Sequence, residues 1–258
     1  MAPVYVGAKV RLEWSALGSV PKRELTADAN YNFAITGIQG KGISVDVGAP
    51  GYRRKKTASR SFEYSSFGEW NFHVPDKNSP VVFELWKLEN AEPIYRWTVH
   101  KNLKTNGEKV WFDLTNGKFG ASGDFAVSTT RGETYAHTKF DYTLTVEAAP
   151  GGGLVLRNEE MMFAAPDQGY QPSWMVQQFG KDPSFDANQK VRFYLRTANG
   201  KYAAIQAEYS QYPNKEAELR ASIYFNPSGS QNLQYDGKKR INKKSVRSKR
   251  DGNLGERK

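Results

Sequence analysis

An alternation of apolar and polar residues with a period of two constrains this chain more than any other feature. Every second residue from Val4 to Trp14 is apolar, and most of the residues between them are polar or charged. Successive side chains of a β-strand point to opposite faces, whereas a helix repeats every 3.6 residues, so the pattern predicts a half-buried strand. The same alternation recurs at residues 31–36, 43–47, 81–86, 139–147, 191–195, 203–207 and 219–225. No run of ten residues has helical periodicity, and the sequence therefore predicts an all-β, antiparallel protein.

Turn-forming residues divide these strands. Asp28 and Asn30 suit a tight turn, and Asn199-Gly200 between two apolar strands predicts a hairpin with a type I′ turn. Residues 53–80 are expected to be a long loop, and residues 89–93 a linker ending in Pro93. We therefore predict two antiparallel β-sandwiches in tandem, residues 1–90 and 94–235, with a final segment at residues 236–258.

Composition excludes several classes of protein. The 258 residues include no cysteine, which excludes disulfides, thiolate metal sites and cysteine nucleophiles. No run approaches the roughly 18 apolar residues of a membrane helix, and the first residues lack the features of a signal peptide. Residues 236–258 hold ten of the 37 Lys and Arg and three of the 27 Asp and Glu, so most of the net charge of +10 lies there. Such a polar, charged segment is expected to be a disordered basic tail.

The N-terminal segment, residues 1–90, resembles a known domain, and its first half carries the resemblance. The order GAKVRLEW (7–14), TADANYNFAITGIQGKGISVDV (26–47) and GY (51–52) is similar to the carboxypeptidase regulatory-like, transthyretin-like β-sandwich. This resemblance implies an earlier strand, so the N-terminal sandwich is expected to lack its first strand. It also favours an exported or envelope-associated protein.

Later segments have a likeness of their own. FAAPDQGYQPS (163–173) and FNPSGSQNLQYD (225–236) resemble modules that follow such sandwiches in planctomycete and verrucomicrobial bacteria. The hairpin at residues 194–203 and the segments 62–67 and 78–87 share this likeness, which transfers no activity.

A search for reaction chemistry finds no catalytic constellation. His73, His100 and His137 lie in different segments without metal-ligand spacing, so no metal site is predicted. Glu159 and Glu160 are adjacent and would point to opposite faces of a strand, which disfavours a glycosidase pair. Asp113 and Asp124 are a second candidate pair, but the sequence does not place them relative to each other. Phosphate-binding, dinucleotide and nucleophile motifs are absent, and we expect neither an enzyme nor a cofactor.

Two groups of residues are candidates for binding. Among six tryptophans, Trp70 and Trp174 lie in loop-like segments and are the two expected to be exposed, where they would stack against a sugar ring or pack their loop onto the sandwich. A cationic group would attract polyanions without sequence specificity. It comprises Arg53, Arg54, Lys55, Lys56, Lys238, Lys239, Arg240, Lys243, Lys244, Arg247, Lys249 and Arg250.

Three functions stay open at this point. The first is a non-catalytic, exported or envelope-associated protein that binds a polysaccharide or a protein partner. The second is an intracellular nucleic-acid or anion binder that acts through the basic tail. The third is a hydrolase in which carboxylates converge in a cleft of a sandwich.

Overall fold

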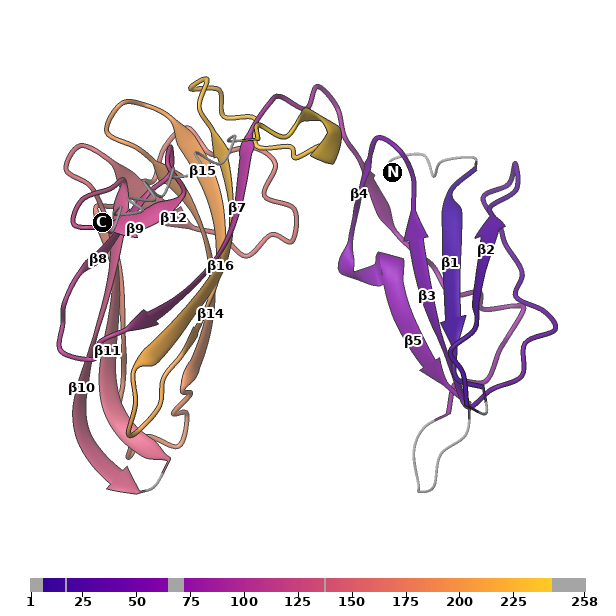
Figure 1. Ribbon diagram of the computed structural model, residues 1–258, viewed down its shortest axis with the longest axis horizontal. Coiled ribbons are helices and arrows are strands. Elements are labelled where there is room, and N and C mark those ends of the chain that lie inside the picture. Colours follow the sequence, from indigo (N-terminus) through magenta and orange to yellow (C-terminus); the bar gives the residue numbers. More distant parts are fainter. Residues whose placement is uncertain (1–6, 17, 65–71, 137, 243–258) are drawn as a thin grey trace, which may run out of the picture.

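The computed structural model describes residues 7–16, 18–64, 72–136 and 138–242, and its regular elements are almost all β-strands (Figure 1). Every ladder between named strands is antiparallel, which confirms the predicted all-β class. Within the described residues the helical content is limited to two single turns, η1 (Lys56–Ala58) and η2 (Gly237–Lys239). The strands form four sheets that group into two stacked units, as tandem sandwiches require.

The N-terminal unit is built on a four-stranded sheet with the order β2-β1-β3-β5. Its second layer consists of extended segments and a short two-stranded ribbon of β4 and β6. The strands of this unit are β1 (Lys9–Trp14), β2 (Lys22–Thr26), β3 (Gly42–Gly48), β4 (Tyr52–Arg54), β5 (Ser59–Glu63) and β6 (Leu85–Lys87).

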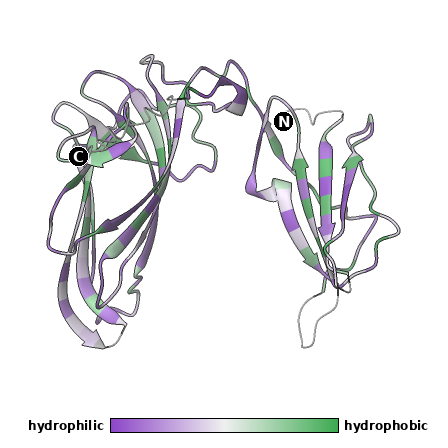
Figure 2. Ribbon diagram, viewed as in Figure 1, coloured by the Kyte–Doolittle hydropathy of each residue, from purple (hydrophilic) through white to green (hydrophobic). Residues whose placement is uncertain are grey.

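Alternation along β1 and β3 makes the four-stranded sheet amphipathic, and Figure 2 shows the resulting stripes. Val10, Leu12 and Val45 are fully buried on one face, and each buried aliphatic side chain of this kind contributes roughly 1.5–3 kcal/mol. The other face carries polar side chains. Phe33 and Phe83, from segments outside the sheet, cover part of the apolar face.

Three predictions for this unit need correction. Residues 31–36 and 81–84, expected to lie in strands, alternate in burial but belong to no ladder, and only Leu85–Lys87 of the second segment pairs, as β6. Residues 22–26 were not foreseen as a strand, and the predicted loop at 53–80 contains β4, η1 and β5. The strands β2 and β5 are sheet edges that pair through their backbones, and each has a single half-buried apolar side chain, Leu25 or Phe62, so neither has an apolar alternation to detect.

The C-terminal unit is a sandwich of two five-stranded sheets, with the orders β13-β11-β10-β8-β9 and β12-β14-β15-β16-β7. Their inner faces share one core in which Phe112, Phe140, Leu144, Phe193 and Ile223 are at most 2% exposed. The strands are β7 (Tyr95–Leu103), β8 (Val110–Asp113), β9 (Lys118–Gly120), β10 (Phe125–Ala136), β11 (Lys139–Ala148), β12 (Gly153–Leu156), β13 (Ser173–Gln178), β14 (Asn188–Arg196), β15 (Tyr202–Ser210) and β16 (Ala217–Asn226).

The strands predicted at 139–147, 191–195, 203–207 and 219–225 are confirmed, but the hairpin turn differs from the prediction. A type I′ turn needs positive φ at both central residues, and only Gly200 has it, at +74°. Thr197 N–H donates to the Lys201 carbonyl at 2.8 Å, which closes a three-residue loop with glycine in the left-handed position. Glycine has no Cβ, so Gly200 adopts the positive φ that this loop requires without steric strain.

The start of the predicted tail is folded against the linker. Ile94 and Arg240 form a parallel bridge, and Ile241 N–H donates to the Ile94 carbonyl at 3.0 Å. The Lys239 ammonium donates to the Ala91 carbonyl at 2.6 Å. Residues 236–242 therefore differ from the disorder that their composition suggests, because backbone partners on β7 and the linker hold them. Residues 243–258 lie outside the described residues.

Candidate functional site

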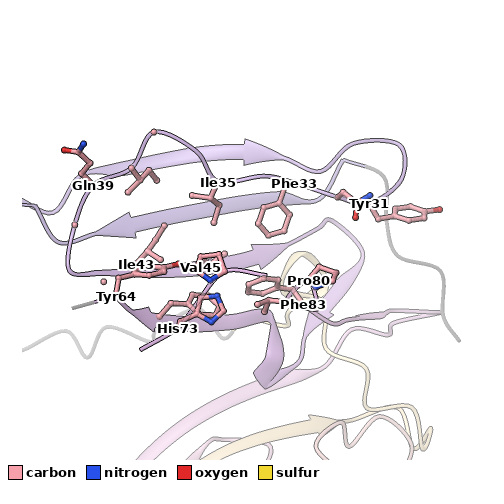
Figure 3. A pocket seen from close by; sticks show the side chains of 18 residues that line it. Tyr31, Phe33, Ile35, Gln39, Ile43, Val45, Tyr64, His73, Pro80 and Phe83 are labelled. Carbon is pink, nitrogen blue, oxygen red and sulfur yellow. The ribbon is translucent and has the colours of Figure 1, made fainter. Parts of the chain in front are cut away.

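An open groove of about 680 Å³ lies over the apolar face of the four-stranded sheet. Ile43 and Val45 of β3 lie beneath it and are only 5% and 0% exposed. Side chains that converge on them from both sides cover them (Figure 3). Three wall segments surround the groove: residues 31–40, residues 62–64 with 73–75, and residues 80–83. We refer to this feature as the groove.

The first wall is positioned by a local hydrogen-bonded turn. The Asp28 Oδ1 atom accepts the backbone N–H groups of Asn30 at 2.8 Å and Asn32 at 2.9 Å, which confirms the predicted turn. Tyr31 follows in the left-handed region at φ +66°, an uncommon conformation for a residue with a side chain. The turn thus directs residues 33–35 along the sheet, where Phe33 and Ile35 point into the groove (Figure 3).

Aromatic contacts hold the other walls. His73 packs with a centroid separation of 4.6 Å on Phe62 of β5 and 5.9 Å from Tyr64, and its backbone N–H donates to the Glu63 carbonyl at 2.9 Å. Burial raises the pKa of the Tyr64 phenol. Phe83 meets Phe33 across the groove at 5.6 Å between ring centroids. The wall of residues 31–40 and the wall of residues 80–83 are therefore in contact through the rings of Phe33 and Phe83.

Absence of charge is the most informative property of the groove. None of the described residues that line it is Asp, Glu, Lys or Arg. Its polar atoms come from a few neutral groups such as Asn32, Gln39 and Tyr64. The described lining thus holds no pair of carboxylates and no lysine or arginine, and it combines apolar side chains with a few neutral polar ones.

Exposed apolar side chains are concentrated around this site. Of the ten large hydrophobic side chains that are exposed among the described residues, five belong to the wall segments or adjoin them. Val74 and Val82 are the most exposed, at 79% and 64%. Two of the five, Tyr31 and Tyr64, line the groove, and the other three are adjacent in sequence to lining residues. The five are Tyr31, Tyr64, Phe72, Val74 and Val82.

A second concave surface, of about 820 Å³, lies on the outer face of the sheet that contains β14, β15 and β16. Two of its cations are ion-paired, Lys190 with Glu208 at 3.3 Å and Arg220 with Glu218 at 3.0 Å. Arg192 donates to the carbonyl of Asn158 at 3.1 Å. This surface is therefore an ion-paired, solvated sheet face, and the groove is the stronger candidate.

The two tryptophans predicted as sugar-stacking residues do not form one site in the described structure. Trp70 lies outside the described residues. Trp174 is in strand β13 and not in an exposed loop, and its half-buried side chain packs against the core of the C-terminal sandwich. Trp174 pairs opposite Val146 of β11, and its side chain therefore lies on the inward face of the sheet. A sugar-binding role for either residue stays a prediction.

The basic residues at 53–56 have intramolecular partners. Arg53 donates to the Tyr224 hydroxyl and lies 5.2 Å and 5.6 Å from the ring centroids of Tyr224 and Tyr235. Arg54 lies 3.8 Å from Asp46, and Lys55 donates to Glu84 at 3.0 Å. The Lys56 backbone N–H donates to Glu160.

Arg53 approaches the residue that precedes the predicted tail. Tyr235, one residue before the tail, contacts both Arg53 and Arg96, while Lys238, Lys239 and Arg240 follow directly. The remaining cations, Lys243, Lys244, Arg247, Lys249 and Arg250, lie outside the described residues, and anion binding stays a prediction.

Three of the carboxylates considered in the sequence have partners within the fold. Glu159 accepts a hydrogen bond from the Tyr194 hydroxyl at 3.0 Å, and Glu160 accepts one from the backbone N–H of Lys56. Asp124 accepts the Leu114 N–H at 2.8 Å, and burial raises the pKa of its carboxyl group. Over the residues placed in the structure, no group of His, Asp or Glu is arranged to hold a metal ion, and no helix is long and apolar enough to cross a membrane.

Comparison with protein-family models and with curated proteins gives no match to this sequence. The resemblance of residues 7–52 to the carboxypeptidase regulatory-like sandwich thus stays a prediction.

The sequence pattern predicts that several wall residues point inward, but it does not predict the groove that they line. Phe33, Ile35, Val81 and Phe83 were identified from their alternation and were assigned to strands that fill a closed sandwich. Their alternation in burial is real, but no strand pairs with either segment. Period two reports the shape of the backbone and cannot report whether a neighbouring strand is present.

Proposed function

We propose that this protein is a non-catalytic binding protein that holds an apolar segment of a partner polypeptide in the groove of its N-terminal unit. The observation that carries this proposal is a groove of about 680 Å³ whose walls include the half-buried side chains of Phe33, Ile35 and Phe83, with no Asp, Glu, Lys or Arg among the described lining residues. Its size is that of ordinary ligand sites, which range from roughly 300 to 1,000 Å³.

The same observation favours a polypeptide over the other partners. Nucleic acids and acidic polysaccharides need cations, and the described lining has none. A neutral sugar presents hydroxyl groups that lose hydrogen bonds with water on binding, and the described lining offers few polar side chains, such as Asn32, Gln39 and Tyr64, to replace them. A peptide with apolar side chains packs against the aromatic and aliphatic walls.

Neighbouring valines provide a matched test. Val81 lines the groove and is half-buried, whereas Val82 is 64% exposed and does not line it. We expect peptides selected from a displayed random library on the wild-type protein to be rich in apolar residues. They should bind Val82→Lys normally and Val81→Lys at least tenfold more weakly, because a lysine there places an ammonium group in the apolar site.

Two outcomes contradict the proposal. One is a selection that yields no peptide, or only peptides that bind Val81→Lys as well as the wild type. The other is a glycan array on which a polysaccharide binds and loses its affinity in Val81→Lys. Circular dichroism and thermal unfolding of both variants confirm beforehand that each is folded.

A further inference from the structure

Strand β13 (Ser173–Gln178) lies at one edge of its sheet, and β11 is its single strand neighbour among the described residues. Its sequence, Ser-Trp-Met-Val-Gln-Gln, contains no charged residue, and its register with β11 runs without a bulge. Exposed edge strands usually carry a charged residue, a proline or a bulge, because each of these discourages pairing with another chain. None of the three is present along β13.

The other sheet edges of the chain are protected. Charged residues lie on the edge strands β2, β4, β5, β6, β7 and β9. The remaining edge strand, β12, is uncharged, but it is four residues long and Leu154 within it is bridged to Gln171. Among the described residues β13 is therefore the one edge strand that has neither a charge nor a partner on its outer side.

Backbone groups on the outer side of β13 are open. The Ala148 N–H donates to the Pro172 carbonyl at 2.9 Å, which fixes the direction of the backbone groups that follow. Because successive strand residues direct these groups to opposite sides, the even-numbered residues of β13 bond to β11 and the odd-numbered ones face outward. No partner for the outward N–H and C=O groups occurs within the described structure. The outward residues are Ser173, Met175 and Gln177.

Apolar side chains at this edge are incompletely covered. Trp174 and Val176 on the inner face are half-buried, whereas their partners on β11, Val146 and Leu144, are 0% exposed. On the outer face Met175 is 56% exposed. A strand added beside β13 therefore covers apolar surface on both faces of the sheet, in addition to bonding the open backbone groups.

From these observations we infer that β13 is a self-association edge, through which two copies of this chain join by antiparallel pairing of their β13 strands. The site lies on the C-terminal sandwich and is independent of the groove. Absence of charge favours a second copy as the occupant. Two-fold pairing of one strand with itself brings like residues close together, so a charged edge would repel its copy, and β13 carries no charge to do so.

A two-fold axis beside Met175 gives the register that uses every outward group. Met175 then lies opposite Met175 of the second copy, and Ser173 lies opposite Gln177, with about six main-chain hydrogen bonds between the strands. On the inner face Trp174 lies beside Val176 of the second copy, so that an aromatic and a β-branched side chain cover each other. Apolar thus meets apolar and polar meets polar, and the two sheets become one continuous sheet.

Sedimentation velocity of the full chain tests the association. We expect a monomer–dimer equilibrium in salt of about 0.15 M, over protein concentrations from about 5 μM to about 1 mM, because a single strand pair is a small interface. Met175→Lys places two ammonium groups beside the axis and should weaken association roughly tenfold or more. Val20→Lys is the matched control, since it also replaces an exposed apolar side chain, 62% exposed, with the same charge, and it should associate as the wild type does.

Proline at residue 177 tests the backbone pairing. The Gln177 N–H faces outward, so Gln177→Pro leaves the hydrogen bonds to β11 in place and removes a donor from the outer side alone. We expect association to weaken roughly tenfold. Circular dichroism and thermal unfolding establish beforehand that this variant and Met175→Lys are folded.

A covalent link tests the register. The chain contains no cysteine, so Met175→Cys introduces a single thiol. Opposed Cα atoms of a hydrogen-bonded pair lie about 5.5 Å apart, within the range that a disulfide spans. Mild oxidation should therefore yield a covalent dimer of Met175→Cys. Thr130→Cys, exposed on β10 of the same sheet, should stay monomeric.

Three results would overturn the inference. The first is a monomer at every concentration. The second is a dimer that Met175→Lys and Gln177→Pro leave unchanged, which assigns association to another surface. The third is slow hydrogen exchange of the Met175 and Gln177 amides in the dilute monomer, which shows that the chain itself covers this edge. Selection of peptides on the groove depends on none of these results, so the proposed function fails or stands separately.

Discussion

The contact of Arg53 with two tyrosines joins the N-terminal unit to the C-terminal sandwich, and its removal should measurably destabilise the protein. Arg53 lies on β4 and donates to the Tyr224 hydroxyl on β16, while its guanidinium stacks near the rings of Tyr224 and Tyr235. A hydrogen bond to a charged group contributes about 1.5–3 kcal/mol, and a cation–π contact about 0.5–2 kcal/mol. Because these terms overlap, we expect Arg53→Ala to lower the free energy of unfolding by about 2–4 kcal/mol.

Arg54, the next residue, is the matched control. Its side chain is 54% exposed and its closest carboxylate, Asp46, is 3.8 Å away, an exposed pair worth about 0–1 kcal/mol. Arg54→Ala should therefore change the free energy of unfolding by less than about 1 kcal/mol. Arg53→Lys keeps the charge but loses the planar group that spans both rings, so it should fall between the two alanine variants.

Urea unfolding followed by tryptophan fluorescence measures these differences. Hydrogen exchange of residues 88–91, which precede the second sandwich, should also accelerate in Arg53→Ala because the ribbon of β4 and β6 loosens. Equal effects of Arg53→Ala and Arg54→Ala, both below 1 kcal/mol, would refute the reasoning. They would show that Trp86 against Phe163, with ring centroids 5.7 Å apart, holds the junction without the arginine.

Two further predictions concern the junction and the second core. Hydrogen bonds from Asn226, Ser230 and Ser228 lower the pKa of Glu92 in the folded protein, so its contribution to stability is present above the ordinary glutamate pKa and is lost as pH falls through the lowered value. Urea midpoints measured from pH 6 to pH 2 should fall less steeply for Glu92→Gln than for the wild type, and identical slopes would contradict this. Leu144, fully buried, should lose about 2–5 kcal/mol on substitution by alanine, whereas Met175→Ala on the neighbouring strand, 56% exposed, should change stability by less than about 1 kcal/mol. Denaturant unfolding of both variants checks this, and a small effect at Leu144 would contradict the position of the core.

The residues of the groove show what a local pattern can establish. Phe33, Ile35, Val81 and Phe83 were correctly expected to point inward, because inward direction depends only on an extended backbone and a period of two. Trp174 shows the opposite case, since a proline and polar neighbours suggested a loop, and pairing with Val146 on β11 placed it on the inner face of a sheet.

Local sequence patterns were enough to predict the all-β class, the long strands of the second sandwich and the turn at Asp28. These features depend on side-chain periodicity and on residues with special backbone conformations, which are local properties. The strands β2 and β5, the missing strand partners of residues 33–35 and 81–83, and the groove between these two segments became evident only in three dimensions. Strand pairing is a contact between residues distant in the chain. A local sequence pattern therefore does not show whether a strand has a neighbour on each side.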